Sequence, residues 1–487
     1  MSNDDRVLLL VEAIQPRLSR KRPLVSTFRG VVFGVFGLML AAACTANCYG
    51  ETTYDLSAGP GSGRVQAVQA VLEVSGELKL NSDGTKVRRL PMQVQGRVAY
   101  DERLLDPDHS GPAWAAKSVR YYTQAEAEIG IGSGSLTPKL DPERRLVVAQ
   151  VDKDGGSFVW PLGLMNSDDL DLIDIPGNTL LLPCILPETP VRVGDTWKVD
   201  GEPLALLMGL DVVTHSDVVG SLDKIDGQTA VLDLQGTIQG AVGGVASEIV
   251  LKAKSNYDLN RHQVTWFAAS LKEDRAIGHA EPGLDVTARL RVAVKPTSSS
   301  THLSDATLQG LSLKADSGSR PLVFESRNAN FRLTHDPRWR SMIDRHDLCV
   351  FRFVDLGDLV AQCNISELPD VEPGKHMALE EFQGEVQRAL GDKFGQIVDG
   401  SKWVSDDGTQ VLRIQVSGMV SEIPVMWIHY HLSSPEGRRA AIAFTLETKL
   451  LERFAENDRL MVDTFEFLPR PEPTEAQLRR PQDPRRS

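Results

Sequence analysis

Cysteine and aromatic residues are scarce in this 487-residue chain, which contains five cysteines and only 6% Phe, Trp and Tyr. No two cysteines form a Cys-x-x-Cys pair, which excludes a zinc ribbon and a thioredoxin-type motif. The chain also lacks the Gly-x-Ser-x-Gly, His-Glu-x-x-His and Walker A sequences that mark common hydrolases, metalloproteases and P-loop proteins. These absences leave no catalytic signature from which a reaction could be assigned.

Long hydrophobic runs are equally rare, and the one that stands out is Val31–Ala46. It is shorter than the run of about 20 apolar residues that a membrane-spanning helix needs. It follows a basic flank, and Ala41-Ala42-Ala43 satisfies the small-x-small rule for cleavage. We therefore expect residues 1–43 to be a signal peptide, and the mature protein to lie in the periplasm or cell envelope of a bacterial cell.

Three alternatives remain open at this end of the chain. Cys44 directly follows the expected cleavage position and would be the site of lipidation, although Ala41 stands where lipoprotein signals prefer Leu. The apolar run could instead remain as an uncleaved anchor, since it falls just under spanning length. The long basic region before it would also fit a true start at Val25.

The charge of the chain is predominantly negative, with a formal value of −13. Residues 1–43 carry six basic and three acidic side chains, so their removal takes the charge to −16. A strongly acidic surface argues against binding to nucleic acid and to anionic lipid headgroups. We therefore expect membrane contact only through the N-terminal segment or a lipid on Cys44.

Residues 64–295 alternate between apolar and polar positions, and Asp-Gly, Gly-Gly or Asn turns separate the runs. This period of two predicts a large, curved antiparallel sheet, either a half-barrel or a sandwich. Two short helices are expected at about 167–175, with Ser167 as N-cap, and at 203–210. They are modest cover for such a sheet. We therefore expect an apolar concave face, lined by alternate residues of 71–74 and 249–251, that a lipid-like ligand or a partner protein fills.

Residues 321–468 change in character and predict a smaller α+β domain, an antiparallel sheet with two helices. The apolar faces of the two helices are Leu379, Phe382, Val386 and Leu390, and Leu450, Phe454 and Met461. The Gly- and Ser-rich residues 44–63 and the Ser-, Thr- and Ala-rich residues 296–320 are expected to be linkers. The Pro- and Arg-rich residues 469–487 are expected to be a disordered tail.

Two resemblances rest on short motifs. The C-terminal domain resembles the PsbP-like fold in its His335-Asp336-Pro337-x-Trp339 segment and in its Asp463-Thr464-Phe465-x-Phe467 ending. The segment Leu186–Trp197 resembles a Pro-Val-x-Val-Gly-Asp-x-Trp turn of secreted bacterial proteins of unknown function, including planctomycete ones. Both resemblances imply binding or structural modules, and neither brings catalytic residues with it.

Two clusters of side chains could be imagined as metal sites. His429 and His431 project from one face of a strand and could ligate zinc or copper, but no third ligand is identifiable. Two histidines on a half-exposed sheet face explain the pattern more simply. Asp168, Asp169, Asp171 and Asp174 match no calcium loop, and acidic residues at a helix terminus account for them.

The other polar groups have structural explanations. Glu273-Asp274-Arg275 and Glu380-Glu381 are expected at strand ends and on a helix face, because adjacent carboxylates do not flank a cleft. Gly194-Asp195-x-Trp197 is expected to form a turn, with a positive φ at Gly194. Cys349 and Cys363 flank a hairpin, where they either form a cross-strand disulfide or remain two small buried residues.

The sequence therefore favours a non-catalytic exported protein. In this interpretation the β-rich domain binds an apolar ligand or an envelope protein and the C-terminal domain serves for docking, with no catalytic, cofactor-binding or metal-binding residue assigned. The alternative is a secreted hydrolase with its site at the interdomain cleft. A cluster of titratable side chains in one cleft would favour the enzyme, and an apolar concavity would favour the binding protein.

Export makes the first testable prediction. N-terminal sequencing of the protein recovered from its native cell should find a mature end between Cys44 and Glu51, because a basic flank precedes an apolar run below spanning length. A mature chain that begins upstream of Val31 would contradict it.

Overall fold

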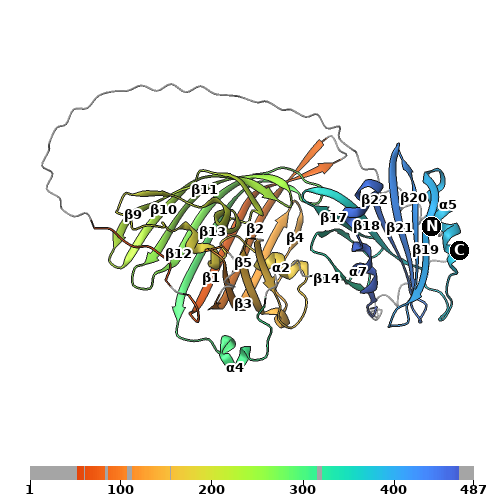
Figure 1. The fold of residues 1–487 in the computed structure, drawn as a ribbon, viewed down its shortest axis with the longest axis horizontal. Helices are drawn as coiled ribbons and strands as arrows, with labels where there is room; N and C mark the ends of the chain where they lie inside the picture. The colour runs from red at the N-terminus through yellow and green to blue at the C-terminus, as the bar shows by residue number, and fades with distance from the viewer. Residues whose placement is uncertain are drawn as a thin grey trace, which may run out of the picture.

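The structure is a computed structural model, and it describes residues 52–59, 61–82, 86–106, 112–153, 155–314 and 321–470. The expected signal peptide and nearly all of the expected tail lie outside these residues. Figure 1 shows a large curved sheet followed by a smaller domain whose strands stand beside it. The predicted fold class, mainly β with a smaller antiparallel sheet and helices, is confirmed.

The large sheet has 13 strands within the described residues, and its pairings are antiparallel. Its strands are β1 (Val65–Ser82), β2 (Lys86–Leu105), β3 (Ala116–Ile131), β4 (Gly134–Leu136), β5 (Leu146–Asp152), β6 (Gly155–Val159), β7 (Thr196–Lys198), β8 (Val212–Ser216), β9 (Val219–Asp226), β10 (Thr229–Val242), β11 (Val245–Asp258), β12 (Gln263–Arg275) and β13 (Gly283–Thr297). The order across the sheet is β6-β5-β3-β2-β1-β13-β12-β11-β10-β9-β7, with β4 beside β3 and β8 beside β10. Strands β6 and β7 are therefore the two ends of this path.

Alternation along the strands separates a buried concave face from an exposed convex one. On β11, Ile249 and Leu251 are buried while Val250 between them is exposed. On β1, Leu72 packs against the core, and Glu73 points outward to an ion pair with Arg291. The expected inward positions in 249–251 and at Leu72 are confirmed, because a period of two assigns each side chain to one face.

The concave face is covered by segments of the same chain, chiefly one long stretch and a short helix that follows it, not by a second sheet. We call residues 160–195 the strap, because they connect β6 to β7 and so pass from one end of the sheet path to the other. The strap contains α2 (Ser167–Ile173) and the 3-10 helix η2 (Thr179–Ile185), and α3 (Gly201–Leu207) follows β7. Asn166 is the N-cap of α2 in place of the predicted Ser167, since the Asn166 side chain accepts a hydrogen bond from the Asp169 amide.

Parts of both expected linkers pack against the large sheet. Leu56 is 1% exposed and belongs to the same apolar cluster as the concave face. The 3-10 helix η3 (Thr301–Leu303) and α4 (Asp305–Leu308) bury Leu303 and Leu308 beside Val119 of β3. The composition of these segments predicts linkers. A few apolar residues are nevertheless enough to pack parts of them against the large sheet.

The C-terminal domain has two sheets. The smaller has the order β14-β15-β23, and the larger has the order β16-β17-β18-β22-β21-β20-β19. Their strands are β14 (Leu322–Ser326), β15 (Phe331–His335), β16 (Trp339–Asp344), β17 (Cys349–Asp355), β18 (Asp358–Leu368), β19 (Phe394–Val404), β20 (Gln410–Val420), β21 (Ile423–Ser433), β22 (Arg439–Glu447) and β23 (Glu466–Phe467). The two short sequence motifs meet here, because β15 carries His335 and pairs with β23, which carries Phe467.

Helices cover both faces of the larger C-terminal sheet. On one face α5 (Leu379–Leu390) buries Phe382, Val386 and Leu390, as predicted. On the other face the predicted single helix is broken into η5 (Thr448–Leu450), α6 (Leu451–Phe454) and α7 (Asn457–Asp463). The break falls at Ala455, whose φ of +49° no helix interior accommodates. Two short 3-10 helices, η1 (Pro142–Arg144) and η4 (Gly391–Lys393), complete the helical elements.

The helices of the described ranges are all too short or too polar to cross a membrane.

The aromatic core of the C-terminal domain gives a stability prediction. Trp339 is 1% exposed and packs against Phe353, Phe444 and Phe454. Trp339→Ala should therefore lower the free energy of unfolding by about 3–5 kcal/mol, measured by urea denaturation. Met342→Ala, at a neighbouring exposed position on β16, should change it by less than about 0.5 kcal/mol. Equal losses in the two variants would contradict the assignment of the core.

Candidate functional site

The concave side of the large sheet forms an apolar trough. Side chains from strands across the sheet meet there, and each is less than 9% exposed beneath the strap. The floor includes Val68, Ala70, Val98, Ala125, Leu232, Leu234, Ile249, Leu251, Phe267, Ala269, Leu290 and Val292. The cover contributes Leu172, Ile173, Leu180, Leu181, Leu182, Ile185, Leu204 and Leu207. The expectation that two short helices leave the face largely uncovered is therefore wrong, because the whole strap packs on it.

At Gly177 the strap backbone lies directly against the middle of the floor. Its φ is +91°, and a Cβ added there would stand 2.7 Å from Leu290 Cδ2 and 3.0 Å from Val292 Cγ2. Leu290 and Val292 both belong to β13, near the centre of the sheet. A glycine is thus required twice, for the backbone conformation and for the close approach.

A buried ion pair lies beneath the strap at the polar end of the trough. Glu102 on β2 faces Arg120 on β3, with 2.8 Å between Arg120 Nε and Glu102 Oε1 and side-chain exposures of 0% and 2%. The strap binds to both partners. Thr179 Oγ1 donates to Glu102 Oε2 at 2.8 Å, and Arg120 Nη2 donates to Asn178 Oδ1 at 2.6 Å. This group is the polar anchor of the strap.

The remaining hydrogen-bonding capacity of the Glu102 carboxylate is also used. Gln66 donates to it at 2.7 Å and Ser118 at 2.9 Å. Desolvation of two charges is repaid only when such additional bonds satisfy them, and removing one partner of a buried pair costs about 3–5 kcal/mol. Sequence analysis missed this anchor. The sequence did contain a signal for it. Glu102 and Arg120 are charged, yet each stands at an inward position of a strand whose other inward positions are mostly apolar.

The C-terminal end of the strap is held by the turn that the sequence predicted. Gly194 has a φ of +91°, and Asp195 Oδ2 accepts a hydrogen bond from the Arg192 amide at 2.8 Å. The Trp197 indole donates to the Ile185 carbonyl at 2.9 Å and stacks over Gly220, where a Cβ would meet the ring. The structural interpretation of this motif is confirmed.

The N-terminal end of the strap is bonded to the C-terminal domain. The Val323 amide on β14 donates to the Met165 carbonyl at 2.9 Å, and Asn166 forms a parallel bridge with Val323. Leu322, the first residue of β14, is 5% exposed and belongs to the apolar cluster of the trough. The smaller domain therefore contacts the large one through the strap itself.

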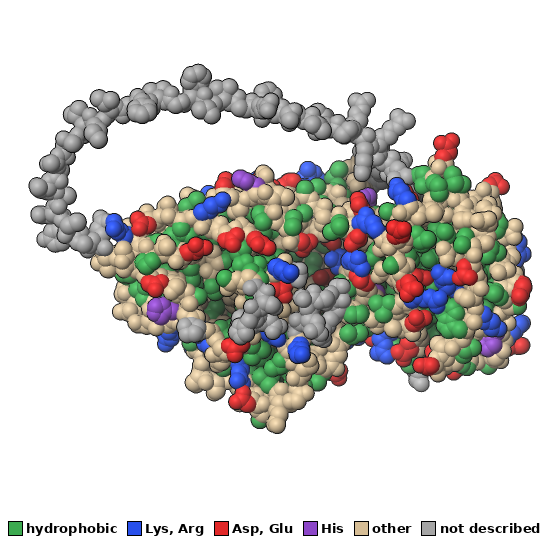
Figure 2. All heavy atoms as spheres, viewed as in Figure 1, with side chains coloured by type: hydrophobic (Ala, Val, Ile, Leu, Met, Phe, Trp, Pro, Cys, Tyr) green, Lys and Arg blue, Asp and Glu red, His purple; other side chains and the backbone are tan. Residues whose placement is uncertain are grey.

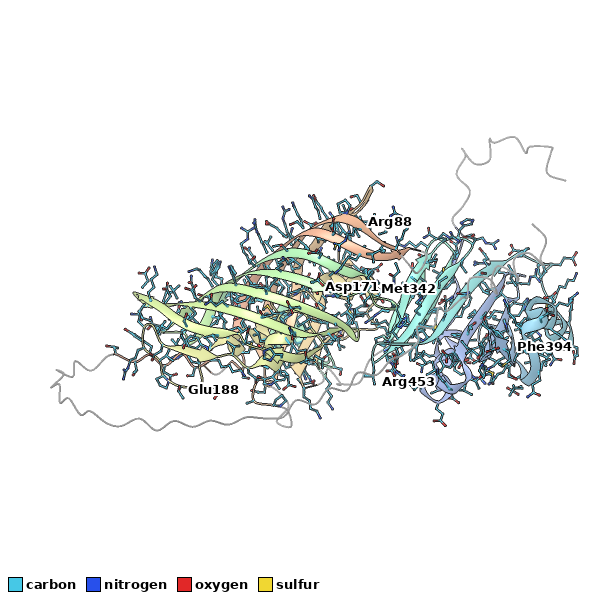
Figure 3. All side chains as sticks on the ribbon, turned by 90° about the horizontal axis from the view of Figure 1, so that it is seen from above. Arg88, Asp171, Glu188, Met342, Phe394 and Arg453 are labelled. Atoms are coloured by element: carbon cyan, nitrogen blue, oxygen red, sulfur yellow. The ribbon has the colours of Figure 1, made fainter. Side chains whose placement is uncertain are left out.

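Acidic side chains of α2 lie at this junction. Asp169 is held by Arg144 at 2.7 Å, which accounts for one of the four clustered aspartates. Figure 3 shows Asp171 facing the region of β16, where Met342 lies. Desolvation raises the pKa of Asp171, and the nearby Arg340 opposes the shift. Desolvation and the charge of Asp171 raise the pKa of Asp174 to about 6. In the described chain, no group of three or more His, Cys, Asp or Glu side chains has an arrangement suited to a metal ion.

Of the two candidate histidines, His431 is more buried than the half-exposed face that the sequence suggested, and His429 agrees with it. His431 is 2% exposed and packs against Phe382 of α5 at a ring-centroid distance of 5.8 Å, while His429 is half-buried. Neither Nε2 atom has a hydrogen-bond partner among the described residues. Burial lowers the pKa of His429 to about 4, and burial together with Arg439 does the same for His431.

The remaining sequence candidates are dispersed. Glu273 accepts hydrogen bonds from Ser247 and Arg275, and Asp274 pairs with Lys79 on the neighbouring part of the sheet. Glu380 and Glu381 are exposed in the first turn of α5, as expected for a helix face. The structure does not bring these carboxylates to the trough.

Cys349 and Cys363 are both buried and both free, although they lie on adjacent strands. The register places Cys349 opposite Ile365 and Cys363 opposite Phe351, so the two cysteines are diagonal neighbours and not a directly opposed pair. Burial raises the pKa of Cys349 to about 12 and raises that of Cys363 as well. Both therefore lie in the apolar core as uncharged thiols.

Charged side chains on the surface are mixed in sign. Figure 2 shows acidic and basic groups interspersed over the visible face of both domains. On the convex face, ion pairs such as Arg291–Glu73 at 2.7 Å and Lys254–Asp233 at 2.9 Å join neighbouring strands. The trough is an apolar face closed by a separate segment of the described chain, and for that reason it is the candidate site.

No protein-family model matches the chain, and no curated protein matches it in sequence. Among solved structures, cyanobacterial PsbP (CyanoP) from Synechocystis sp. PCC 6803 is similar over 31% of this chain and 94% of its own, with 11% identity and a TM-score of 0.24. Lipovitellin is similar over 49% of this chain and 26% of its own, with 7% identity and a TM-score of 0.27. Both similarities are distant, and the resemblance to secreted planctomycete proteins stays a prediction.

The buried histidines predict a pH dependence of stability. Their folded pKa of about 4 lies below the unfolded value of about 6.5. Their stabilising contribution is therefore complete above pH 6.5 and is lost as the pH falls from 6.5 towards 4. Between pH 7 and pH 4.5 the free energy of unfolding should fall by roughly 2 to 3 kcal/mol per histidine, measured by urea denaturation.

Two variants test the source of this pH dependence. His429→Leu combined with His431→Leu should flatten the decline, while His346→Leu, at a side chain that is 85% exposed, should leave it unchanged. An unaltered decline in the double variant would assign the effect to other groups.

Proposed function

We propose that this chain is a non-catalytic exported protein of the cell envelope, whose β-rich domain binds an apolar ligand in the trough. The observation that carries the proposal is the apolar trough closed by the strap and α3 without a second sheet. A sandwich would bury the same floor under a second sheet with its own ladder of backbone hydrogen bonds. The strap has side-chain contacts and scattered backbone bonds in place of a continuous ladder, so a chain-like apolar molecule could take the place of its middle part.

The class of ligand follows from the chemistry of the floor. Aliphatic side chains from β1, β2, β10, β11 and β13 form most of it, and the charged groups at its polar end already satisfy one another. Such a surface offers apolar contact with few free polar groups, which suits a lipid-like chain better than a sugar or a nucleotide. An apolar segment of a partner protein is the other occupant with this chemistry.

The C-terminal domain is proposed to dock this carrier to another component of the envelope. Its two sheets and its helices enclose an aromatic core of their own around Trp339, Phe353 and Phe444. It therefore adds a separate surface to the molecule while holding one end of the strap through Val323.

Binding can be tested with the uncharged dye Nile red and a matched pair of glycine variants. Gly177→Ala forces a methyl group against Leu290 and should loosen the strap, whereas Gly194→Ala imposes the same φ of +91° where nothing lies within 4 Å. We expect saturable Nile red fluorescence with the wild type, binding at least about fivefold tighter in Gly177→Ala, and no gain in Gly194→Ala. Absence of saturable binding in both the wild type and Gly177→Ala would overturn the proposal.

A direct test uses the native molecule. The protein purified from its own cell envelope should carry an apolar small molecule that mass spectrometry detects under non-denaturing conditions. The same measurement on a sample extracted with organic solvent and refolded serves as the control.

A further inference from the structure

The strap can move only as a tethered loop, because each of its ends continues into an edge of the sheet. It leaves β6 after Val159 and enters β7 at Thr196. Its C-terminal end is also tied to β9, since the Gly194 amide donates to the Leu222 carbonyl and the Leu222 amide donates to the Asp195 carbonyl. Any opening of the trough must therefore lift the middle and the N-terminal part of the strap while the C-terminal end stays in place.

Between these ends, polar side-chain and backbone contacts hold the strap down at three points, the third being the ion pair of Arg144 with Asp169 of α2 at 2.7 Å. The first is the polar anchor, where Thr179 and Asn178 contact the buried pair Glu102 and Arg120. The second is the backbone bond from the Val323 amide of the C-terminal domain to the Met165 carbonyl. At Gly177 the strap packs closely against Leu290 and Val292, and the Gly177 amide donates to the Leu207 carbonyl of α3 at 2.8 Å.

We propose that the strap is a gate over the trough and that the C-terminal domain controls it through β14. This inference rests on the proposed function, because opening the gate would admit the apolar ligand to the trough. When β14 holds Met165, the N-terminal end of the strap is fixed and the trough is closed. When the C-terminal domain docks elsewhere and β14 shifts, the N-terminal part of the strap keeps the polar anchor and the Arg144–Asp169 pair but loses its backbone bond to Val323.

We call the polar anchor and the bond from Val323 to Met165 the two latches. The mechanism requires a closed and an open state of the strap, and each latch favours the closed one. A latch that contacts only the closed state shifts the equilibrium by its differential free energy, so loss of either latch raises the open population. Couplings between sites in proteins are typically in the range of about 5- to 150-fold. A change of this size is large enough to be measured by the accessibility of a residue on the strap.

The strap carries a natural reporter of this kind. Cys184 lies in η2 and packs partly buried against the trough cluster, and burial raises the pKa of its thiol. Cys349 and Cys363, buried in the other domain, report unfolding of that domain instead. Peptide mapping after alkylation with N-ethylmaleimide distinguishes these positions from Cys44 and Cys48.

Each latch has a variant with a matched control. Thr179→Val removes the strap's bond to Glu102 while Arg120, Gln66 and Ser118 still satisfy the carboxylate, and Thr189→Val makes the same change at an exposed position of the strap. Val323→Pro removes the amide that donates to Met165, and Glu325→Pro makes the same backbone change two residues further along β14.

The gate predicts that Thr179→Val and Val323→Pro each raise the alkylation rate of Cys184 by about tenfold, with Cys349 and Cys363 unchanged and both controls at the wild-type rate. An unchanged rate at Cys184 in Val323→Pro would overturn control by the C-terminal domain. Simultaneous labelling of all three cysteines would overturn the gate as well, because the strap would then open only with global unfolding.

Nile red binding separates the gate from the proposed function. Faster labelling of Cys184 without any gain in dye binding would retain the gate and reject the trough as the ligand site. Dye binding in the wild type with unchanged Cys184 rates in both latch variants would retain the binding function and reject the gate.

Discussion

A curved antiparallel sheet with one apolar face must cover that face, and the rest of this structure depends on how the chain does so. Most of the cover comes from the sequence between the two end strands β6 and β7, with α3 added directly after β7, so the segment that closes most of the trough also connects its rims. Because the ends of the segment are fixed by the strands, its length and its few polar contacts decide how firmly the trough is closed.

The polar anchor makes the position of the strap specific. Apolar packing alone tolerates sliding of one surface over another, whereas a buried carboxylate and guanidinium have to be satisfied at defined positions. Thr179 and Asn178 complete the hydrogen bonding of Glu102 and Arg120, which fixes the register of the strap on the sheet. Since β14 holds the other end at Met165, the same segment links the trough to the C-terminal domain.

Much of the fold could be predicted from periodicity because side-chain direction is a local property. Alternation placed Ile249 and Leu251 inward, and helical spacing placed Phe382, Val386 and Leu390 on the buried face of α5. The predictions were wrong where a residue's conformation or burial depends on segments distant in the sequence. The apolar spacing around Phe454 continues through Ala455, yet the backbone at Ala455 has a positive φ and the helix breaks there. His431 was placed on the correct strand, but only α5 packing against it shows that the ring is buried.

The sequence by itself determined the two-part β-rich organisation, the face of each strand and the turn at Gly194-Asp195, because these follow from spacing and from backbone preferences over a few residues. Only the tertiary structure decided that β6 and β7 are the ends of the sheet path, and therefore that residues 160–195 are a strap. It also brought Thr179 onto Glu102, 77 residues away in sequence. The way the strap closes the trough depends on which strands pair across the whole domain. Local sequence patterns do not determine that pairing.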